Sequence, residues 1–461
     1  MKLPFLPCLR RAVLPVMLCA LCSVANAQTD PPDDENASGI LIDAQGVVRP
    51  NRGIDRAGEL NSKRSEAFAN EHLDDNLQAF SAMRLVSLPR LEQAYTAALD
   101  AGQSLPPEVE YVAGLQRIDY VFVNPETKDV FLAGPAEGFA PDEAGRMRGL
   151  TTGRPVIRLD HLVVAFRSVF RGQDSIGCSI DPDKGRLAEL QRWVQANSTP
   201  TSSSGAKRRY SQMAEILGME NVDIWGVPPE SHYALTLVDA DFAMKRIALG
   251  TEPSRVRGIK SHLSLLSPTG NSMQRWWFAP LYDPVQVSED GNAYHITGQR
   301  VQLMAQEERV SAGGGRSNNA FTRASTQQFA QLFTEHYPEL AEKNPVFAQL
   351  QNLFDLAVVA ALLRNDGVLE RTGWRADVIL DRAVVPVCPV PKQVPSDATT
   401  RPARGGTMLG LIGGVVLDVG LIAQNRNVRT TEAAENTEVS ETPLPEVPEF
   451  AAGEGASWWK D

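Results

Sequence analysis

Alternation of apolar and polar positions is strongest between residues 117 and 139, RIDYVFVNPETKDVFLAGPAEGF. Ile118, Tyr120 and Phe122 fall on one face of an extended chain, because successive side chains of a strand point to opposite sides. An Asn-Pro pair interrupts this run, and a second apolar run follows at 130–133. The pattern predicts two antiparallel strands joined by a polar turn, a β-hairpin.

Gly134, Pro135 and Gly138 close the second run. Glycines after a strand can turn backbone N–H groups toward an anion, but that arrangement opens a helix and carries a Lys or a G-x-G-x-x-G spacing. Neither follows here, so these residues are interpreted as turn residues rather than a phosphate loop. Glu137 lies among them and is a candidate ligand-binding residue, which could act as a base in a cleft. The default interpretation of Glu137 is a solvated turn carboxylate.

Helical periodicity marks much of the first half of the chain. In residues 87–102, Leu88, Leu91 and Tyr95 share one face, and Ser87 is a suitable N-cap. Strands and further helices alternate up to about residue 250. This mixture predicts an α+β fold, in which helices flank a mixed sheet.

Residues 275–310 change to short β-type runs separated by turns, which predicts an antiparallel β meander. In the stretch RWWF, Trp276 and Phe278 share one face and are expected in the core, whereas Trp277 shares the other face with Arg275. Arg275 and Trp277 are therefore candidate ligand-binding residues. Either a helix or a neighbouring domain covers them, or they form an exposed platform for a glycan, a peptide or a partner subunit.

A helical segment follows the meander. Residues 353–363 are apolar on nearly every side, which is typical of a buried helix, and they are too few to span a bilayer. Residues 405–423 carry glycines at every fourth position, as in paired membrane helices, but Asp418 limits the apolar run. Val415 and Leu417 alternate as in a strand, so a core strand is favoured. No integral membrane segment is expected in the mature chain.

Five further motifs accompany the hairpin: GRPVIRLDHLVVAF (153–166), CSIDP (178–182), RWWFAPLYDPVQVSEDG (275–291), RAS (323–325) and YPELAEKNPVFAQLQNLFDLAVVAAL (337–362). Together they resemble the domain-of-unknown-function family 1598 of planctomycete bacteria, whose known members are uncharacterised secreted proteins. The resemblance extends over roughly residues 85–425. No activity or active site is assigned to this family, so the resemblance implies membership and no reaction.

The N-terminus has the order of a secretory signal peptide. Three basic residues precede the apolar run 12–24, and Ala-Asn-Ala precedes Gln28. The run is too short for a membrane anchor, which needs about 20 apolar residues. We therefore expect cleavage between Ala27 and Gln28, removal of residues 1–27, and a secreted or periplasmic mature protein.

The remaining chain divides into four expected parts: a disordered leader at 28–60, an α/β-type domain at 61–255, a β meander with helices at 256–425, and a disordered acidic tail at 426–461. The leader and the tail are rich in acidic residues and proline, so they bury too little to offset the entropy of folding. The polar stretch STPTSSSGAKRR at 198–209 is expected to be a mobile surface loop.

Charge and cysteine content narrow the classes of partner. The chain holds 45 basic and 56 acidic residues, a net charge of −11, and loss of the signal peptide removes three positive charges. Because such a surface repels phosphate backbones, we expect no nucleic acid partner.

Cys178 and Cys388 would remain in the mature chain, and the sequence leaves open whether they form a disulfide or two buried thiols.

The patterns that mark known chemistry do not occur. The chain has no H-E-x-x-H, no cysteine pair at metal-ligand spacing, no Walker lysine and no G-x-S-x-G, so we expect no metal and no cofactor. His161, His232, His262 and His295 each stand alone in the sequence. His336 follows an apolar helical face and is expected to be a hydrogen-bonded core residue.

Two classes of function remain. The favoured one is an exported, non-catalytic binding or assembly module of the cell envelope, with an envelope protein or a glycan as partner. The alternative is an exported hydrolase-like enzyme whose residues converge only in three dimensions. A cleft that gathers Glu137, His232 or His295 with Ser or Asp partners would support the enzyme.

Overall fold

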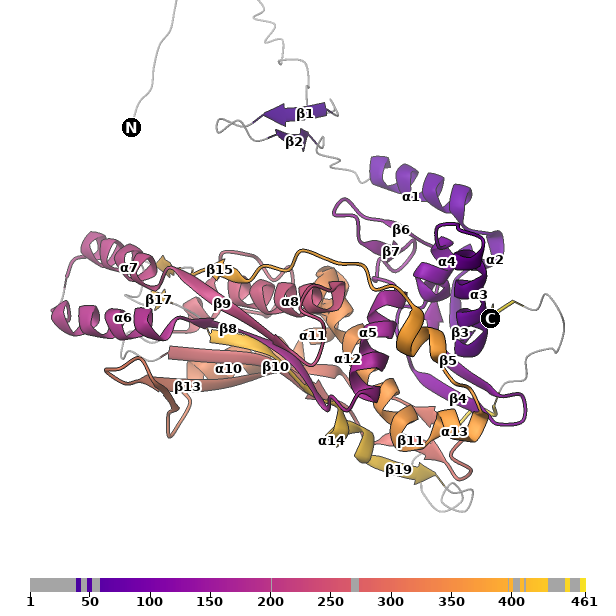
Figure 1. The fold of residues 1–461 in the computed structure, drawn as a ribbon. Coiled ribbons are helices and arrows are strands. Elements are labelled where there is room, and N and C mark those ends of the chain that lie inside the picture. Colours follow the sequence, from indigo (N-terminus) through magenta and orange to yellow (C-terminus); the bar gives the residue numbers. More distant parts are fainter. Residues whose placement is uncertain are drawn as a thin grey trace, which may run out of the picture. The chain divides into compact units, whose positions relative to one another are not determined.

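A computed structural model describes residues 39–42, 48–51, 59–199, 201–266, 273–396, 398–400, 407–409, 412–429, 444–447 and 457–461 (Figure 1). The chain forms two units, Met1–Leu60 and Asn61–Asp461. In the first unit, β1 (Gly39–Ile42) pairs antiparallel with β2 (Val48–Asn51). The signal peptide and its cleavage site at Ala27 and Gln28 lie outside the described residues, so they stay a prediction.

The second unit contains two seven-stranded sheets. The first sheet has, in spatial order, β14 (Arg316–Asn318), β13 (Arg300–Val310), β10 (Met273–Leu281), β18 (Ile412–Asp418), β8 (Ser175–Pro182), β9 (Met219–Trp225) and β15 (Gln393–Pro395). Strand β18 runs parallel to β10 and antiparallel to β8, so the sheet is mixed. Val415 and Leu417 on β18 are fully buried, which confirms the core strand expected within 405–423.

The second sheet has, in spatial order, β19 (Arg426–Arg429), β11 (Val285–Ser288), β12 (Ala293–His295), β4 (Tyr120–Asn124), β5 (Asp129–Ala136), β3 (Ser81–Ser87) and β20 (Trp459–Lys460). Strands β4 and β5 pair antiparallel, which confirms the predicted hairpin. Two short pairs complete the strands: β6 (Phe139–Pro141) with β7 (Met147–Gly149), and β16 (Ala398–Thr400) with β17 (Thr407–Leu409).

The single meander expected at 275–310 is wrong. Strands β10 and β13 pair in the first sheet, whereas β11 and β12, which lie between them in sequence, belong to the second. The chain crosses back to the first sheet through Gly298 and Arg300, both at positive φ. Both sheets therefore mix strands from 61–255 and 256–425, and the expected boundary near residue 255 does not separate two sheets.

Helices lie beside and between these sheets, which confirms the α+β class and the helical segment after residue 323. They are α1 (Glu59–His72), α2 (Asp75–Gln78), α3 (Leu88–Asp100), α4 (Pro107–Glu110), α5 (Leu159–Phe170), α6 (Lys184–Ala196), α7 (Ser203–Leu217), α8 (His232–Leu249), α9 (His262–Leu265), α10 (Ala324–Glu335), α11 (Tyr337–Lys343), α12 (Pro345–Asn365), α13 (Val368–Thr372) and α14 (Val419–Gln424), with a 3₁₀ turn at Val112–Gly114 and a π turn at Val378–Arg382.

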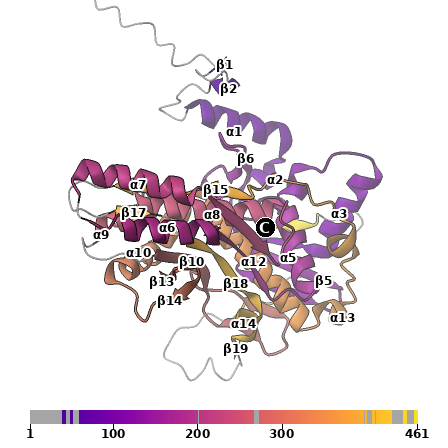
Figure 2. The same cartoon turned by 60° about the vertical axis from the view of Figure 1, so that its left-hand side comes forward.

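Two helical predictions have different outcomes. Helix α3 begins after Ser87, whose side chain accepts a hydrogen bond from the Arg90 backbone N–H, so the predicted cap is confirmed. The mobile loop expected at 198–209 is wrong, because α7 begins within it. Ser202 caps α7 by accepting a hydrogen bond from the Gly205 N–H, and α6 and α7 lie side by side in both views (Figures 1 and 2).

Helix α12 is the most buried helix of the described chain. Seventeen of its residues are buried, and α5 and α8 pack against it. By length and composition α12 could cross a membrane, and it is the one such helix among the described residues. Its apolar side chains lie in the protein core, so the expectation of a buried helix is confirmed.

The RWWF strand shows the predicted alternation. Trp276 and Phe278 are fully buried on β10. Their rings pack on α10, with centroids 5.3 Å from Phe329 for Trp276 and 5.8 Å from Phe333 for Phe278. This aromatic group fastens α10 to the first sheet.

The tail expected to be disordered at 426–461 departs from that expectation in three places. Arg426–Arg429 forms β19, Leu444 and Val447 pack on an apolar cluster, and Trp459–Lys460 forms β20. Composition alone suggested disorder because acids and prolines dominate. Isolated apolar residues and a terminal Trp pair nevertheless supply enough contact area to dock these short segments.

Two buried histidines make stability depend on pH. Burial lowers the pKa of His161 to about 4 and that of His262 to about 3. An unfolded histidine titrates near pH 6.5, so the unfolded chain binds more protons than the folded chain below that pH. Their contribution is therefore fully present above about pH 6.5 and is lost as the pH falls toward 4.

We expect the free energy of unfolding to fall by up to about 1.4 kcal/mol per pH unit for each histidine between about pH 6 and 5. His262→Phe removes one titrating group while keeping an aromatic ring beside Trp276. Urea unfolding at several pH values should show a flatter slope for this variant. The exposed His72→Gln is the control, and an unchanged slope in His262→Phe would contradict the assignment.

Candidate functional site

Glu137 is locked into its turn. Its carboxylate accepts hydrogen bonds from the side-chain amide of Gln116 and from the backbone N–H groups of Thr151 and Thr152. Burial alone would raise the pKa of Glu137, but the hydrogen bonds from Thr152 and Thr151 hold it below its ordinary value. The side chain is buried, so the solvated carboxylate is wrong. An ionised, fully bonded carboxylate is a structural support and a poor base.

The glycines around the hairpin are explained by close packing. A Cβ on Gly134 would lie 2.1 Å from the Arg117 carbonyl oxygen, and one on Gly149 would lie 1.9 Å from the Glu137 carboxylate. Only glycine allows these approaches. Gly134 and Pro135 lie within β5, so the turn interpretation is wrong for these two residues, whereas Gly138 follows the strand.

Arg275 and Trp277 lie together on the face of β10 opposite the core. The Arg275 guanidinium is 5.3 Å from the Trp277 ring centroid and 3.6 Å from the Glu308 carboxylate. Trp277 is half-buried and pairs across the strands with Met304, which is 39% exposed. On β9 of the same sheet Trp225 is also half-buried. Arg275 and Trp277 are thus neither fully covered nor free, and they stay candidate ligand-binding residues.

Two residues that stand alone in the sequence meet in the structure. His232, the first residue of α8, lies with Nδ1 2.7 Å from the Asp160 carboxylate. Arg158 donates to both oxygens of the same carboxylate, at 2.8 and 3.0 Å. Burial alone would raise the pKa of Asp160, yet the His232 hydrogen bond and the Arg158 guanidinium hold it well below its ordinary value. Asp160 is therefore a stable anion that orients the His232 ring.

The two thiols are separate and protonated. Cys178 and Cys388 are both free and buried, so the question left by the sequence is answered by two buried thiols. The Cys388 backbone N–H donates to the carbonyl oxygen of Glu230, close to His232. Burial raises the pKa of both thiols, which makes them poor nucleophiles.

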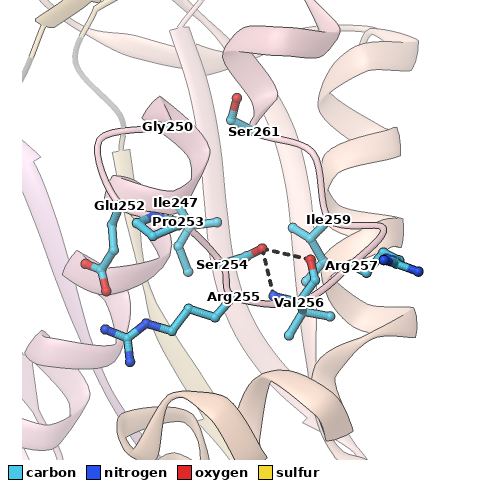
Figure 3. A pocket seen from close by; sticks show the side chains of 10 residues that line it. All are labelled: Ile247, Gly250, Glu252, Pro253, Ser254, Arg255, Val256, Arg257, Ile259 and Ser261. Atoms are coloured by element: carbon cyan, nitrogen blue, oxygen red, sulfur yellow. Dashed lines mark hydrogen bonds between the residues drawn. The ribbon is translucent and has the colours of Figure 1, made fainter. Parts of the chain in front are cut away.

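A hollow of about 530 Å³ lies at the C-terminal end of α8 (Figure 3). This volume is within the range of sites that hold small molecules or side chains of a partner. Its lining combines apolar and polar groups: Ile247, Gly250, Glu252, Pro253, Ser254, Arg255, Val256, Arg257, Ile259 and Ser261. We call this the loop pocket, because residues 250–261 form most of it.

The end of α8 and two anchors of the following loop shape the loop pocket. Gly250 ends α8 in the left-handed conformation, and its N–H bonds the Arg246 and Ile247 carbonyls. Val256 is buried, and the Ser254 carbonyl accepts a hydrogen bond of 3.1 Å from the Asn344 side chain. Arg255 lies at φ +60°, a conformation costly for a residue other than glycine. The fold thus holds the loop in a strained shape instead of letting it relax.

The segment that forms the loop pocket carries an excess of positive charge, and the pocket lining itself holds Arg255 and Arg257 against Glu252. Within residues 246–261 the chain carries Arg246, Arg255, Arg257 and Lys260 against Glu252, a local net charge of +3 in a protein of net −11. Arg246 contacts Glu252 at 3.3 Å. Among the described residues, no carboxylate pairs with Arg255 or Arg257, and their side chains leave the loop in opposite directions on either side of Val256 (Figure 3).

The sequence analysis did not predict the loop pocket, because neither the end of α8 nor the loop at 250–261 contains a known motif. The signal available was the sequence PSRVRGIKS at 253–261, in which basic residues alternate with a single apolar anchor. His336, expected in the core, is instead half-exposed beside Gly258 of this loop and 3.3 Å from Glu339. Within the described parts of the chain, no group of three or more His, Cys, Asp or Glu side chains is arranged to hold a metal ion.

Comparison with known proteins gives a match to a protein family. The family model described as a protein of unknown function (DUF1598) matches residues 178–262. No curated protein and no solved structure matches this chain. The match covers a smaller part of the chain than the resemblance over 85–425 and supports membership of that family. It runs from β8 to the first residue of α9 and includes the whole loop pocket.

Proposed function

We propose that this protein is an exported binding module of the cell envelope, and that the loop pocket binds an anionic polymer, either an acidic peptide segment or an anionic glycan. The observation that carries the proposal is the net charge of +3 within residues 246–261, the segment that forms a ligand-sized hollow in an acidic protein. The family match includes this loop and assigns no reaction.

The geometry favours an extended ligand over a compact one. Arg255 and Arg257 diverge from the hollow, so a single small anion cannot reach both guanidinium groups, whereas a chain with spaced carboxylates can (Figure 3). Each exposed ion pair contributes little by itself, and salt screens it. Several pairs acting together in a strained, preformed loop yield measurable and salt-sensitive binding.

We expect the chain from Gln28 onward to bind poly-glutamate or polygalacturonate and to ignore neutral dextran. Arg255→Ala with Arg257→Ala should weaken binding about tenfold or more at low salt, because two of the four local cations are removed. Fluorescence titration at two salt concentrations measures the loss.

The matched control is Lys63→Ala with Arg64→Ala, an equal charge change on exposed residues of α1. Equal losses of affinity in both double variants would show that the attraction is non-specific and would contradict binding at the loop pocket. Trp277→Ala tests the other candidate surface in the same assay: selective loss there would move the ligand to the Arg275 and Trp277 face.

Export is the second part of the proposal and rests on the order of charges, apolar run and A-x-A site at the N-terminus. We expect protein recovered outside the cytoplasm to begin at Gln28. N-terminal sequencing of that material decides the matter, and an intact Met1 would remove the cell-envelope part of the proposal.

A second candidate function is an exported hydrolase-like enzyme, favoured by one observation. Asp160 orients His232 by a 2.7 Å contact, the arrangement that prepares a histidine as a general base. No hydroxyl or thiol of the described residues is in hydrogen-bond contact with the His232 ring, so water would have to be the nucleophile. The binding module remains the favoured function, because binding at the loop pocket requires no side-chain nucleophile, whereas none contacts His232 among the described residues.

Turnover assays separate the two candidates. If the chain hydrolyses chromogenic esters, His232→Gln should lower kcat about a hundredfold or more, because it removes the base while keeping a polar side chain beside Asp160. Circular dichroism checks that the variant remains folded. An unchanged kcat in a folded His232→Gln variant would remove the enzyme alternative.

A further inference from the structure

The C-terminal residues dock on the second sheet. Strand β20 pairs antiparallel with β3, which would be the edge strand without it, with Trp459 opposite Val86 and Lys460 opposite Leu85. The Ser87 N–H also donates to the Trp458 carbonyl at 2.9 Å. Figure 1 shows the C-terminus beside β3 and α3. An edge strand offers unpaired backbone groups, and here the last residues of the chain satisfy them.

A buried arginine recognises the final residue. Arg84 is fully buried, and its Nε and Nη2 donate to the two carboxylate oxygens of Asp461, at 2.7 and 3.1 Å. The same guanidinium donates to four backbone carbonyls and lies 4.5 Å from the Trp459 ring centroid. Among the described carboxylates, Asp461 is the one paired with Arg84. Without the tail, Arg84 would be a buried cation with no counter-ion, which is energetically costly.

A second contact lies on the face of the same sheet opposite the main core. This docking face consists of Leu85, Phe122, Phe131, Ala133 and Ala293. Val121 and Val123 alternate with Phe122 on β4 and point into the main core, so the two sets occupy opposite sides. The described side chains that pack on the docking face are Tyr120, Leu444 and Val447. Two of these three side chains, Leu444 and Val447, belong to the tail.

We infer that the β3 edge, Arg84 and the docking face form a peptide-docking groove, and that its ligand is the C-terminal segment 444–461, which a second copy of this chain can supply. The mode combines β-strand addition with an apolar face and with recognition of the Asp461 side-chain carboxylate by a buried arginine. The groove is separate from the loop pocket and does not depend on the proposed function.

Chain length allows the exchange between copies. Strands β19 and β20 lie at opposite edges of the second sheet, six strand spacings or about 29 Å apart. The chain between Arg429 and Trp458 could extend to about 90 Å. The extended chain is about three times longer than the distance between the two edges of the sheet. The docked segment therefore need not come from the same copy. The tether gives docking within one copy a millimolar effective concentration, so exchange requires high protein concentration.

The test uses a chain that ends at Thr442 and a labelled synthetic peptide of residues 443–461. We expect one-to-one binding to the truncated chain and at least tenfold weaker apparent binding to the full chain, whose groove is occupied. Asp461→Asn in the peptide should weaken binding at least tenfold, because it replaces the charged partner of Arg84. Glu446→Gln removes the same charge from an exposed residue and should bind like the parent peptide.

Binding that ignores Asp461→Asn, or a folded truncated chain that does not bind the peptide, would overturn the groove. If the truncated chain does not fold, a protease site placed within 430–443 of the full chain replaces it. After cleavage the tail should stay bound and be displaced by excess parent peptide but not by the Asp461→Asn peptide. Loss of the tail at cleavage, with an unchanged near-ultraviolet spectrum and no rebinding, would equally overturn it.

Exchange between copies has its own measurement. Sedimentation of an equimolar mixture of truncated and full chains should show a one-to-one complex that grows as concentration approaches the millimolar range. The full chain with Asp461→Asn should form much less of it. Absence of any complex at these concentrations would overturn supply by a second copy.

Discussion

Much of the second unit depends on one buried ionic contact. Asp355, fully buried on α12, contacts the Arg300 guanidinium at 3.3 Å and accepts a 2.9 Å hydrogen bond from the Tyr282 hydroxyl. Arg300 is the first residue of β13 in the first sheet, and it also reaches Asp119, next to β4 of the second sheet, at 2.8 Å. One guanidinium therefore joins the central helix and both sheets. Loss of either partner would leave an uncompensated charge in the core, which constrains all three elements together.

That contact explains why the chain between β10 and β13 changes sheets. Arg300 sits at φ +74° directly after the crossing, and its side chain also donates to the Ile118 and Ile296 carbonyls. The strain of the backbone at this position is offset by a fully bonded, charged side chain. The spacing of apolar residues does not reveal these contacts, because Arg300 is 55 residues from Asp355 and 181 residues from Asp119. The expected meander failed for this reason.

Local patterns predicted local structure well. The β4–β5 hairpin, the Ser87 cap, the opposite faces of Trp276 and Trp277, and the β18 strand all followed from residues close in sequence. Candidate sites required distant contacts and were mostly missed.

Two of the missed contacts join residues that are far apart, whereas the loop pocket was missed because its neighbouring residues match no known motif. Asp160 and His232 are 72 residues apart, and Arg84 and Asp461 are 377 apart. Glu137 illustrates the converse, since its sequence position in a turn was read correctly but its burial depended on Thr151, Thr152 and Gln116. The role of a carboxylate near a turn can be assigned only when the groups that donate hydrogen bonds to it are known.

The position of β18 affects how the protein reaches its native state. This strand lies in the middle of the first sheet, between β10 and β8, yet its residues, 412–418, come near the end of the chain. During synthesis, β8 and β10 lack their shared neighbour until more than 400 residues have been made. Such a topology delays the closing of long loops and exposes apolar strand edges for longer than a sheet of consecutive strands would. The first sheet is therefore completed only after residues 412–418 have been made, and the nascent chain depends on being kept from aggregating until then.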